Sequence, residues 1–286
     1  MTNPYSAYTK RLLRLRAQGA VLPLGGLTPP RQRQPGRRAP RLCIFSPHPD
    51  DECIIGGLAL RLQREARYRV VNVAVTQGSR RERQSERWRE LSEACHYLGF
   101  ELLSTAPSGL TGVNLATKQT DPNRWSAMVD TIAGILATQR PRMVFMPHDQ
   151  DWNSTHIGTH HLVLEALGRV PAFTCLVVET EFWGAMSTPN LMVELDARNL
   201  ADLMAALSFH VGEVQRNPYH LTLPAWMQDN VRRGGELVGG QGGAAPPFAF
   251  ATLYRLRRWT GHELAPMYPD GRMISMNDDL RGLFHG

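Results

Sequence analysis

Short apolar runs alternate with amphipathic segments over most of this chain. The runs have the length of buried strands, and they lie at residues 42–45, 69–76, 101–104, 143–146, 174–179 and 191–195. Helices are expected between them at residues 51–67, 81–98, 123–138, 157–167 and 197–211, with an irregular stretch at 108–122. This alternation predicts an α/β fold: a doubly wound, mostly parallel Rossmann-like sheet with helices on both faces.

The two ends of the chain lack this alternation. A short helix is expected over residues 8–20, and residues 28–40, rich in Pro, Arg and Gln, predict an extended linker. The pattern fades again after Asn217. Residues 234–243 carry six glycines and predict a mobile loop, and residues 248–256 fit a late strand or helix.

Basic residues are concentrated near the N-terminus. Residues 1–41 hold nine of the 32 Lys and Arg residues and none of the 26 acids, although the whole chain carries only +6. Such a segment could contact nucleic acid or anionic lipid, but Tyr5 and Tyr8 are its only aromatic residues. We therefore expect a solvated basic leader and linker over residues 1–40, no nucleic-acid partner, and one globular domain over residues 41–286.

Membrane and secretion signals are weak in this chain. No apolar run approaches the length that crosses a bilayer, and residues 17–27 are too short and too rich in glycine for a signal peptide. The four cysteines are widely spaced without a Cys-x-x-Cys pair, which indicates reduced core thiols. We expect a cytoplasmic protein without stable membrane insertion, and a homo-oligomer stays open.

A polar cluster follows the first apolar run directly. Its residues are Ser46-Pro47-His48-Pro49-Asp50-Asp51-Glu52, at a point where a strand should end and a helix begin. Parallel sheets bind ligands outside the carboxyl ends of their strands. His48 and Asp51, three apart on the expected first helical turn, can face one cation while Asp50 faces elsewhere. One or two acids at a helix start commonly occur because they interact favourably with the helix dipole. Three consecutive acids after His-Pro are more than this interaction explains.

A second polar cluster, residues 149–156, follows the run at 143–146. With His156 as a third ligand, two imidazoles and a carboxylate would leave one position open, as in a catalytic zinc site. From the residues alone, His156 also fits a structural histidine, and His160 and His161 compete with it.

Beyond these clusters, the chain resembles a known family at several separated points. His-Pro-Asp-Asp-Glu after a strand, followed by Gly56-Gly57, is similar to the PIG-L/LmbE-like zinc-dependent N-deacetylases. Further similarities occur in order over roughly residues 41–216: Thr76 to Gly78, Arg83, Arg87, Glu90, Gly99, Glu181, Trp183, Pro189-Asn190, Glu194 and His210. The resemblance implies that His48, Asp51 and His156 bind Zn²⁺, with Fe²⁺ or another divalent metal compatible, and that Asp50 is the general base.

One position departs from the family pattern. Asn153 stands where the family carries a histidine that steadies the oxyanion. An amide can donate a hydrogen bond but has no titrating proton. We expect Asn153 to take over this catalytic role, with His210 as the alternative.

The expected function is that of a metal-dependent hydrolase acting on linear C–N amide bonds. It would remove an acyl group from the amine of a small-molecule amino sugar or a related compound, and acetyl is the expected acyl group. Three alternatives stay open: an amidase for a larger amide such as a thiol conjugate, a non-haem iron oxygenase with the same two-histidine, one-carboxylate set, and a catalytically silent metal-binding protein.

Overall fold

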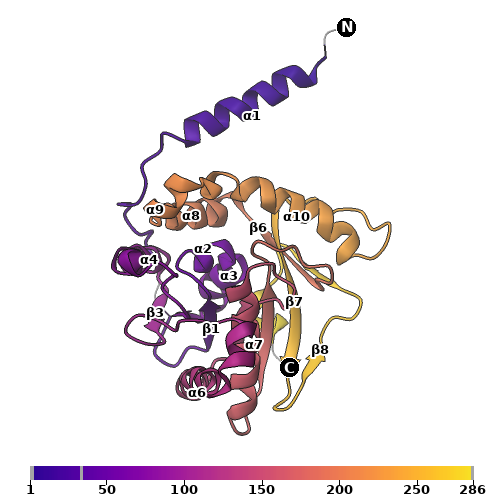
Figure 1. Ribbon diagram of the computed structural model, residues 1–286. Helices are drawn as coiled ribbons and strands as arrows, with labels where there is room; N and C mark the ends of the chain where they lie inside the picture. The colour runs from indigo at the N-terminus through magenta and orange to yellow at the C-terminus, as the bar shows by residue number, and fades with distance from the viewer. Residues whose placement is uncertain (1–2, 33–34, 285–286) are drawn as a thin grey trace.

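The computed structural model describes residues 3–32 and 35–284 (Figure 1). Within these residues the fold is organised around one nine-stranded sheet in the order β3-β2-β1-β4-β5-β7-β6-β9, with β8 paired to β7. The strands are β1 (Arg41–Ser46), β2 (Arg69–Ala74), β3 (Glu101–Ser104), β4 (Met143–Pro147), β5 (Cys175–Thr180), β6 (Leu191–Leu195), β7 (Phe250–Trp259), β8 (Leu264–Pro266) and β9 (Arg272–Ile274).

The helices connect and cover these strands. They are α1 (Tyr5–Gly19), α2 (Asp51–Ile54), α3 (Gly56–Ala66), α4 (Gln84–Leu98), α5 (Leu115–Thr120), α6 (Pro122–Gln139), α7 (Ser154–Arg169), α8 (Ala197–Leu207), α9 (Val211–Arg216), α10 (Leu223–Leu237) and α11 (Leu280–Leu283). Two short 3₁₀ turns, η1 (Arg81–Arg83) and η2 (Tyr219–Leu221), complete the set in the described chain.

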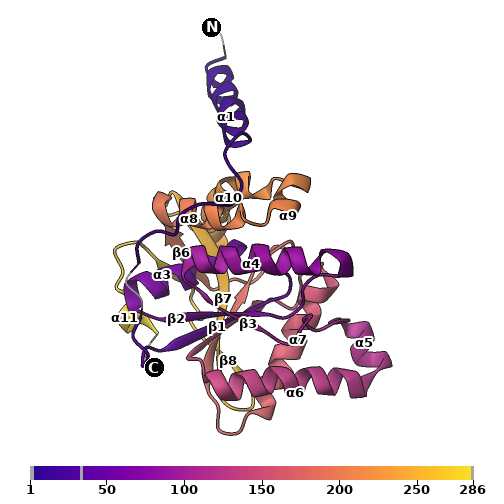
Figure 2. The ribbon, with the colours of Figure 1, turned by 90° about the vertical axis from the view of Figure 1, so that its left-hand side faces the viewer.

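Side chains of the central strands alternate between two hydrophobic cores. Leu42 and Ile44 of β1 point into one core, and Cys43 and Phe45 point into the other. Helices α3, α4 and α8 cover the first core, whereas α6 and α7 cover the second (Figure 2). The expected doubly wound, mostly parallel sheet is therefore confirmed, because β1, β2, β3, β4 and β5 pair in parallel.

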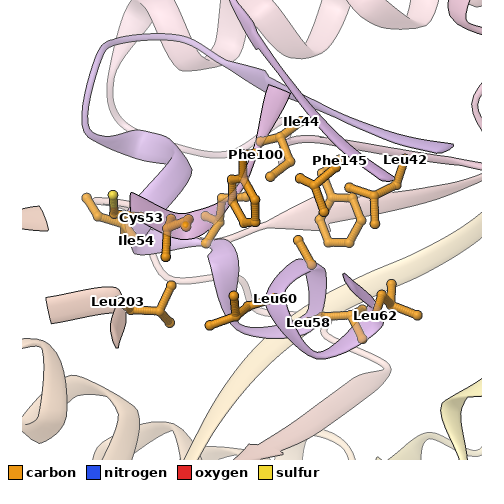
Figure 3. Close-up of a cluster of buried hydrophobic side chains, with 14 of the residues drawn as sticks. Leu42, Ile44, Cys53, Ile54, Leu58, Leu60, Leu62, Phe100, Phe145 and Leu203 are labelled. Atoms are coloured by element: carbon orange, nitrogen blue, oxygen red, sulfur yellow. The ribbon is translucent and has the colours of Figure 1, made fainter. Parts of the chain in front are cut away.

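The first core shows how the motif after β1 is anchored. Leu58 and Leu62 of α3 face Leu42 of β1 and Phe145 of β4 (Figure 3). These side chains are almost completely buried. Packing of this kind fixes the position of α3, and with it the turn that leads from β1 into the helices.

The C-terminal third extends the sheet with an antiparallel strand. The stretch expected as a late strand or helix is β7, which runs antiparallel to β5 and β6. Helix α10 packs on it, and a Cβ at Gly234 would lie 2.9 Å from Leu253 Cδ2 of β7, so glycine permits the close approach. The expected loop over residues 234–243 was therefore wrong at its start, since α10 continues to Leu237.

Other boundaries also differ from the expectation. The helix expected over residues 51–67 is broken at Ile55, where the Tyr254 hydroxyl accepts a hydrogen bond from Leu58 N and donates to Ile55 O. The irregular stretch contains α5, and the helix expected over residues 197–211 ends at Leu207. Tertiary partners decide these boundaries, and local periodicity does not report them.

Helix α1 stands away from the rest of the molecule (Figures 1 and 2). None of its side chains is buried. Among the described residues, no helix is both long and apolar enough to span a bilayer.

Two helical glycines allow a test of the packing. Gly134 in α6 has no atom within 4 Å of the position a Cβ would take, whereas a Cβ at Gly158 in α7 would lie 2.7 Å from Asn114 Cα. We expect Gly134→Ala to raise the free energy of unfolding by about 0.5–1 kcal/mol, since alanine favours the helix. Gly158→Ala should lower it by about 1–3 kcal/mol, because the backbone that it meets cannot rotate away. Denaturant unfolding measures both, and equal effects of the two substitutions would contradict this packing.

Candidate active site

Apart from His210, the expected site residues lie in the turns and first helical residues that follow β1 and β4. These strands are neighbours in the sheet, and the chain leaves β1 toward β2 on one side and reaches β4 on the other. This is the topological switch point of an open α/β sheet, where a crevice forms outside the strand ends.

Three side chains meet there in a compact triangle. His48 Nδ1 lies 3.2 Å from His156 Nε2 and 3.5 Å from Asp51 Oδ2, and His156 Nε2 lies 3.4 Å from Asp51 Oδ2. Ligands at about 2.0–2.1 Å from a tetrahedral ion are separated by about 3.3–3.4 Å. The three atoms are therefore spaced as a divalent cation requires, and they form one of two groups in the described residues with this potential.

The local backbone explains how two of these side chains converge. His48 precedes α2 and does not lie on its first turn, so the helical spacing expected for His48 and Asp51 was wrong. Instead, Asp51 Oδ2 accepts a hydrogen bond from His48 N at 2.8 Å, which draws the two residues together across the turn. Asp51 is buried, whereas 22% of the His48 side chain is exposed, so the triangle opens toward solvent on the His48 side.

A second carboxylate, Asp151, lies behind His156. Asp151 Oδ2 lies 3.5 Å from His156 Nδ1, slightly beyond a well-formed hydrogen bond. Asp151 is itself held by the backbone N–H groups of Asn153 at 2.9 Å and Gly184 at 3.4 Å. A carboxylate behind a ligating histidine fixes its tautomer and leaves the other nitrogen free to bind a metal. The sequence placed Asp151 in the motif without assigning it this role.

The electrostatics of the triangle suit a cation. Burial alone would raise the pKa of Asp51, but His156 and His48 hold it well below its usual range. Burial lowers the pKa of His156, and Asp51 and Asp151 outweigh this effect and raise it to about 9. Without a metal, the triangle therefore attracts a proton, which a bound cation would displace.

Asp50 is held by its backbone in an unusual conformation. Its φ is 112°, in the left-handed region that favours glycine. Glu52 Oε2 accepts a hydrogen bond from Asp50 N at 3.0 Å, and Glu52 Oε1 contacts His210 Nε2 at 2.8 Å. Strain at a non-glycine residue persists only where its surroundings enforce it, and it is concentrated at functional sites.

The carboxylate of Asp50 is fixed by a residue far along the chain. The Tyr219 hydroxyl donates to Asp50 Oδ2 at 2.6 Å, and Arg87 lies 3.7 Å from the same oxygen. Burial and the neighbouring Asp51 raise the pKa of Asp50 to about 6, against the opposing effects of Arg87, His210 and Tyr219. Sequence reasoning missed Tyr219, since it lies in the region where the periodic signal fades.

The two remaining expected residues, Asn153 and His210, have different partners in the structure. Asn153 is the N-cap of α7, and its Oδ1 accepts hydrogen bonds from Thr155 N at 2.9 Å and His156 N at 3.4 Å. Its amide N–H groups lie outside this cap. His210 is completely buried beside Glu52, and the Glu52 charge outweighs burial and raises its pKa. His210 thus contacts Glu52, which in turn accepts a hydrogen bond from the backbone N–H of Asp50. In this way it supports the turn at Asp50.

Two cavities adjoin this centre. One, of about 230 Å³, is lined by aromatic side chains that include Phe182, Trp183, Tyr219 and Trp226. Phe182 meets the His156 ring edge-on, with ring centroids 4.6 Å apart. The other, of about 170 Å³, is rich in arginine, and its lining residues are Ser79, Arg80, Arg83, Arg87, Glu213 and Arg216.

A family model described as GlcNAc-PI de-N-acetylase, PIG-L, matches residues 43–167. This segment contains the whole triangle as well as Asp50 and Asn153. The similarity to the PIG-L family model is therefore confined to residues 43–167 of the 286-residue chain. Tyr219 and His210, which orient the Asp50 turn, lie beyond the matched PIG-L segment.

Solved structures share the fold of this chain at low identity. N,N'-diacetylchitobiose deacetylase from Pyrococcus horikoshii is 16% identical, with a TM-score of 0.53 over 91% of this chain and 94% of that one. The A40926 pseudoaglycone deacetylase Dbv21 is 15% identical, with a TM-score of 0.56 over 79% and 99%. The 4-carboxy-2-hydroxymuconate hydratase GalB from Pseudomonas putida is 16% identical, with a TM-score of 0.53 over 76% and 95%. No curated protein matches the sequence.

The triangle can be tested by its metal content. His48→Ala and His156→Ala should each bind well below one divalent ion per chain after dialysis, because two ligands hold a cation far less tightly than three. His262→Ala is the matched control, since His262 is exposed and lies outside the site. Elemental analysis of the folded variants measures the loss. Full metal content in both ligand variants would place the metal elsewhere.

Proposed function

We propose that this protein is a zinc-dependent N-deacetylase that removes an acyl group, in the first place acetyl, from the amine of an amino sugar or a related small molecule. The single observation that carries the proposal is the position of Asp50. Its buried carboxylate lies directly beside a triangle of metal-ligand type without belonging to it. Hydrolysis of an amide needs such a pairing of an electrophile with a separate proton carrier.

The chain divides the chemistry between the triangle and Asp50. A zinc ion held by His48, Asp51 and His156 would lower the pKa of a bound water to roughly 7 and polarise the substrate carbonyl. Tyr219 fixes Asp50 Oδ2, and we assign proton transfer to Asp50 Oδ1. This atom takes the proton as the water oxygen joins the carbonyl carbon, and it returns the proton to the amine nitrogen as the C–N bond breaks.

Asn153 is our proposed partner for the oxyanion. Its Oδ1 is committed to the cap of α7, so the amide can rotate little, and its N–H groups are held in one orientation on the loop that leads to His156. A donor fixed before the reaction stabilises developing negative charge without reorganisation. His210, buried beside Glu52, is assigned instead to positioning the Asp50 turn.

The aromatic cavity supports a sugar-like substrate. Trp183 and Tyr219 meet edge to face with ring centroids 5.7 Å apart, and 41% of Trp183 is exposed. Aromatic faces of this kind bury the apolar face of a sugar ring while leaving its hydroxyls hydrated. Tyr219 both lines this cavity and orients Asp50, which would bring the sugar amide next to the proton carrier.

A hydratase is the second reaction class to be separated, because GalB has the same fold. A hydratase adds water across a carbon–carbon double bond and releases no amine. A screen of N-acetylated amino sugars with the zinc-loaded protein, read by release of primary amine, distinguishes the two classes. Hydration of an unsaturated acid without amine release from any amide would overturn the deacetylase proposal.

Replacement of the proton carrier gives the sharpest test of the mechanism. Asp50→Asn should retain the metal but lower turnover by about a hundred- to ten-thousand-fold, since the amide cannot accept the proton. The parental rate should also fall as the pH drops below about 6, where Asp50 becomes protonated; a bound cation would move this limb to lower pH.

The matched control is Asp130→Asn, which changes a largely exposed carboxylate on α6. It should leave turnover unchanged. Turnover near the parental value in Asp50→Asn, with metal content intact, would remove Asp50 from the reaction.

Asn153 can be tested by separating its two functions. Asn153→Ser keeps an acceptor for the helix cap, whereas Asn153→Ala removes it and should lower the free energy of unfolding by about 1 kcal/mol. Neither side chain replaces the amide N–H groups, so both variants should lose turnover by about a hundred- to a thousand-fold. Kinetics and denaturant unfolding measure the two effects. Parental turnover in Asn153→Ser would show that Asn153 is only a helix cap.

A further inference from the structure

Helix α1 presents large apolar side chains to solvent. Tyr5, Tyr8, Leu12, Leu13 and Leu15 are between 49% and 73% exposed, and Val21 and Leu22 just beyond the helix are also exposed. Among the described residues, this segment holds seven of the eleven exposed large hydrophobic side chains. Such a concentration marks an interaction surface.

The apolar side chains share one side of the helix. At about 100° per residue, all five fall within about 160° of the circumference, and Lys10, Arg11 and Arg14 occupy the opposite half. Arg16 lies within the apolar half, where a long side chain can extend past the apolar surface to reach water. This face is wider than the narrow seam of a two-stranded coiled coil.

The charge of the segment selects the kind of partner. Residues 1–41 contain no acid, and within the described chain no ion pair is found for Lys10, Arg11, Arg14 or Arg16. A second copy of α1 would bring two uniformly basic helices together, which their repulsion opposes. A nucleic acid would match the charge but would leave the leucine and tyrosine side chains in water.

We propose that α1 binds the surface of an anionic lipid bilayer, lying parallel to it. The apolar half would enter the boundary between headgroups and acyl chains, while the basic residues meet anionic headgroups. Nothing in the body obstructs this placement, because α1 has no buried side chain and stands apart from the sheet (Figures 1 and 2). The proposal concerns surface binding without insertion across the bilayer and is independent of the enzymatic function.

Vesicle co-flotation of the whole protein tests the proposal. The protein should float with vesicles of phosphatidylcholine mixed with about one-third phosphatidylglycerol, and much less with phosphatidylcholine alone. Lys10→Gln combined with Arg14→Gln should weaken binding by about tenfold or more, since each basic residue near an anionic surface strengthens it about fivefold. Leu12→Ser combined with Leu15→Ser should also weaken it by about tenfold or more, because apolar burial is lost.

Leu237→Ser is the matched control, since it removes an exposed leucine from the end of α10. It should bind like the parent. The α1 variants should keep the parental unfolding midpoint because α1 packs no side chain into the body.

Three results would overturn the proposal. The first is equal or absent binding to both kinds of vesicle. The second is dimerisation through Leu12 and Leu15, seen by light scattering, without vesicle binding. The third is binding to duplex DNA that the double serine variant retains in full while vesicle binding is absent.

Discussion

Three consecutive buried carboxyl groups set the conditions that the rest of the site must meet. Asp50, Asp51 and Glu52 are each at most 6% exposed, and a buried charge is costly unless it is paired. Each acid has a different partner. Asp51 faces His48 and His156, Glu52 contacts His210, and Asp50 contacts Tyr219 and Arg87. The division keeps like charges apart and gives adjacent residues different chemical properties.

This division depends on the fold as a whole. The triangle is supplied by the loops after β1 and β4, which only a parallel sheet with a switch point brings together. His210 and Tyr219, which contact Glu52 and Asp50, come from the α9 and η2 region, and Arg87, the second partner of Asp50, comes from α4. Because deacetylases and a hydratase share this fold at 15–16% identity, the reaction must be inferred from the side chains at the switch point.

The sequence predicted the parallel sheet and the two polar clusters, because apolar runs and motif residues are local signals. His48 and Asp51 could be named from the pattern of residue types, whereas His156 needed the family resemblance because His160 and His161 compete with it. His48 converges on Asp51 through a backbone hydrogen bond that no helical spacing describes. Tyr219 could not be named, since it meets Asp50 from 169 positions away and nothing in its own segment signals the contact. The break at Ile55 was hidden for the same reason, because it depends on Tyr254 from the last long strand.

The distance between Asp50 and Tyr219 in the sequence has a consequence for synthesis and truncation. Synthesis proceeds from the N-terminus. When the chain reaches position 156 it contains all three residues of the triangle, but His210 and Tyr219 have not yet been added. Up to that stage, a nascent or truncated chain contains the proposed ligands but not the partners that position the Asp50 turn and its carboxylate. The proposed ligands and the residues that position the proposed proton carrier are therefore separated along the chain, and His210 and Tyr219 both lie in its C-terminal third.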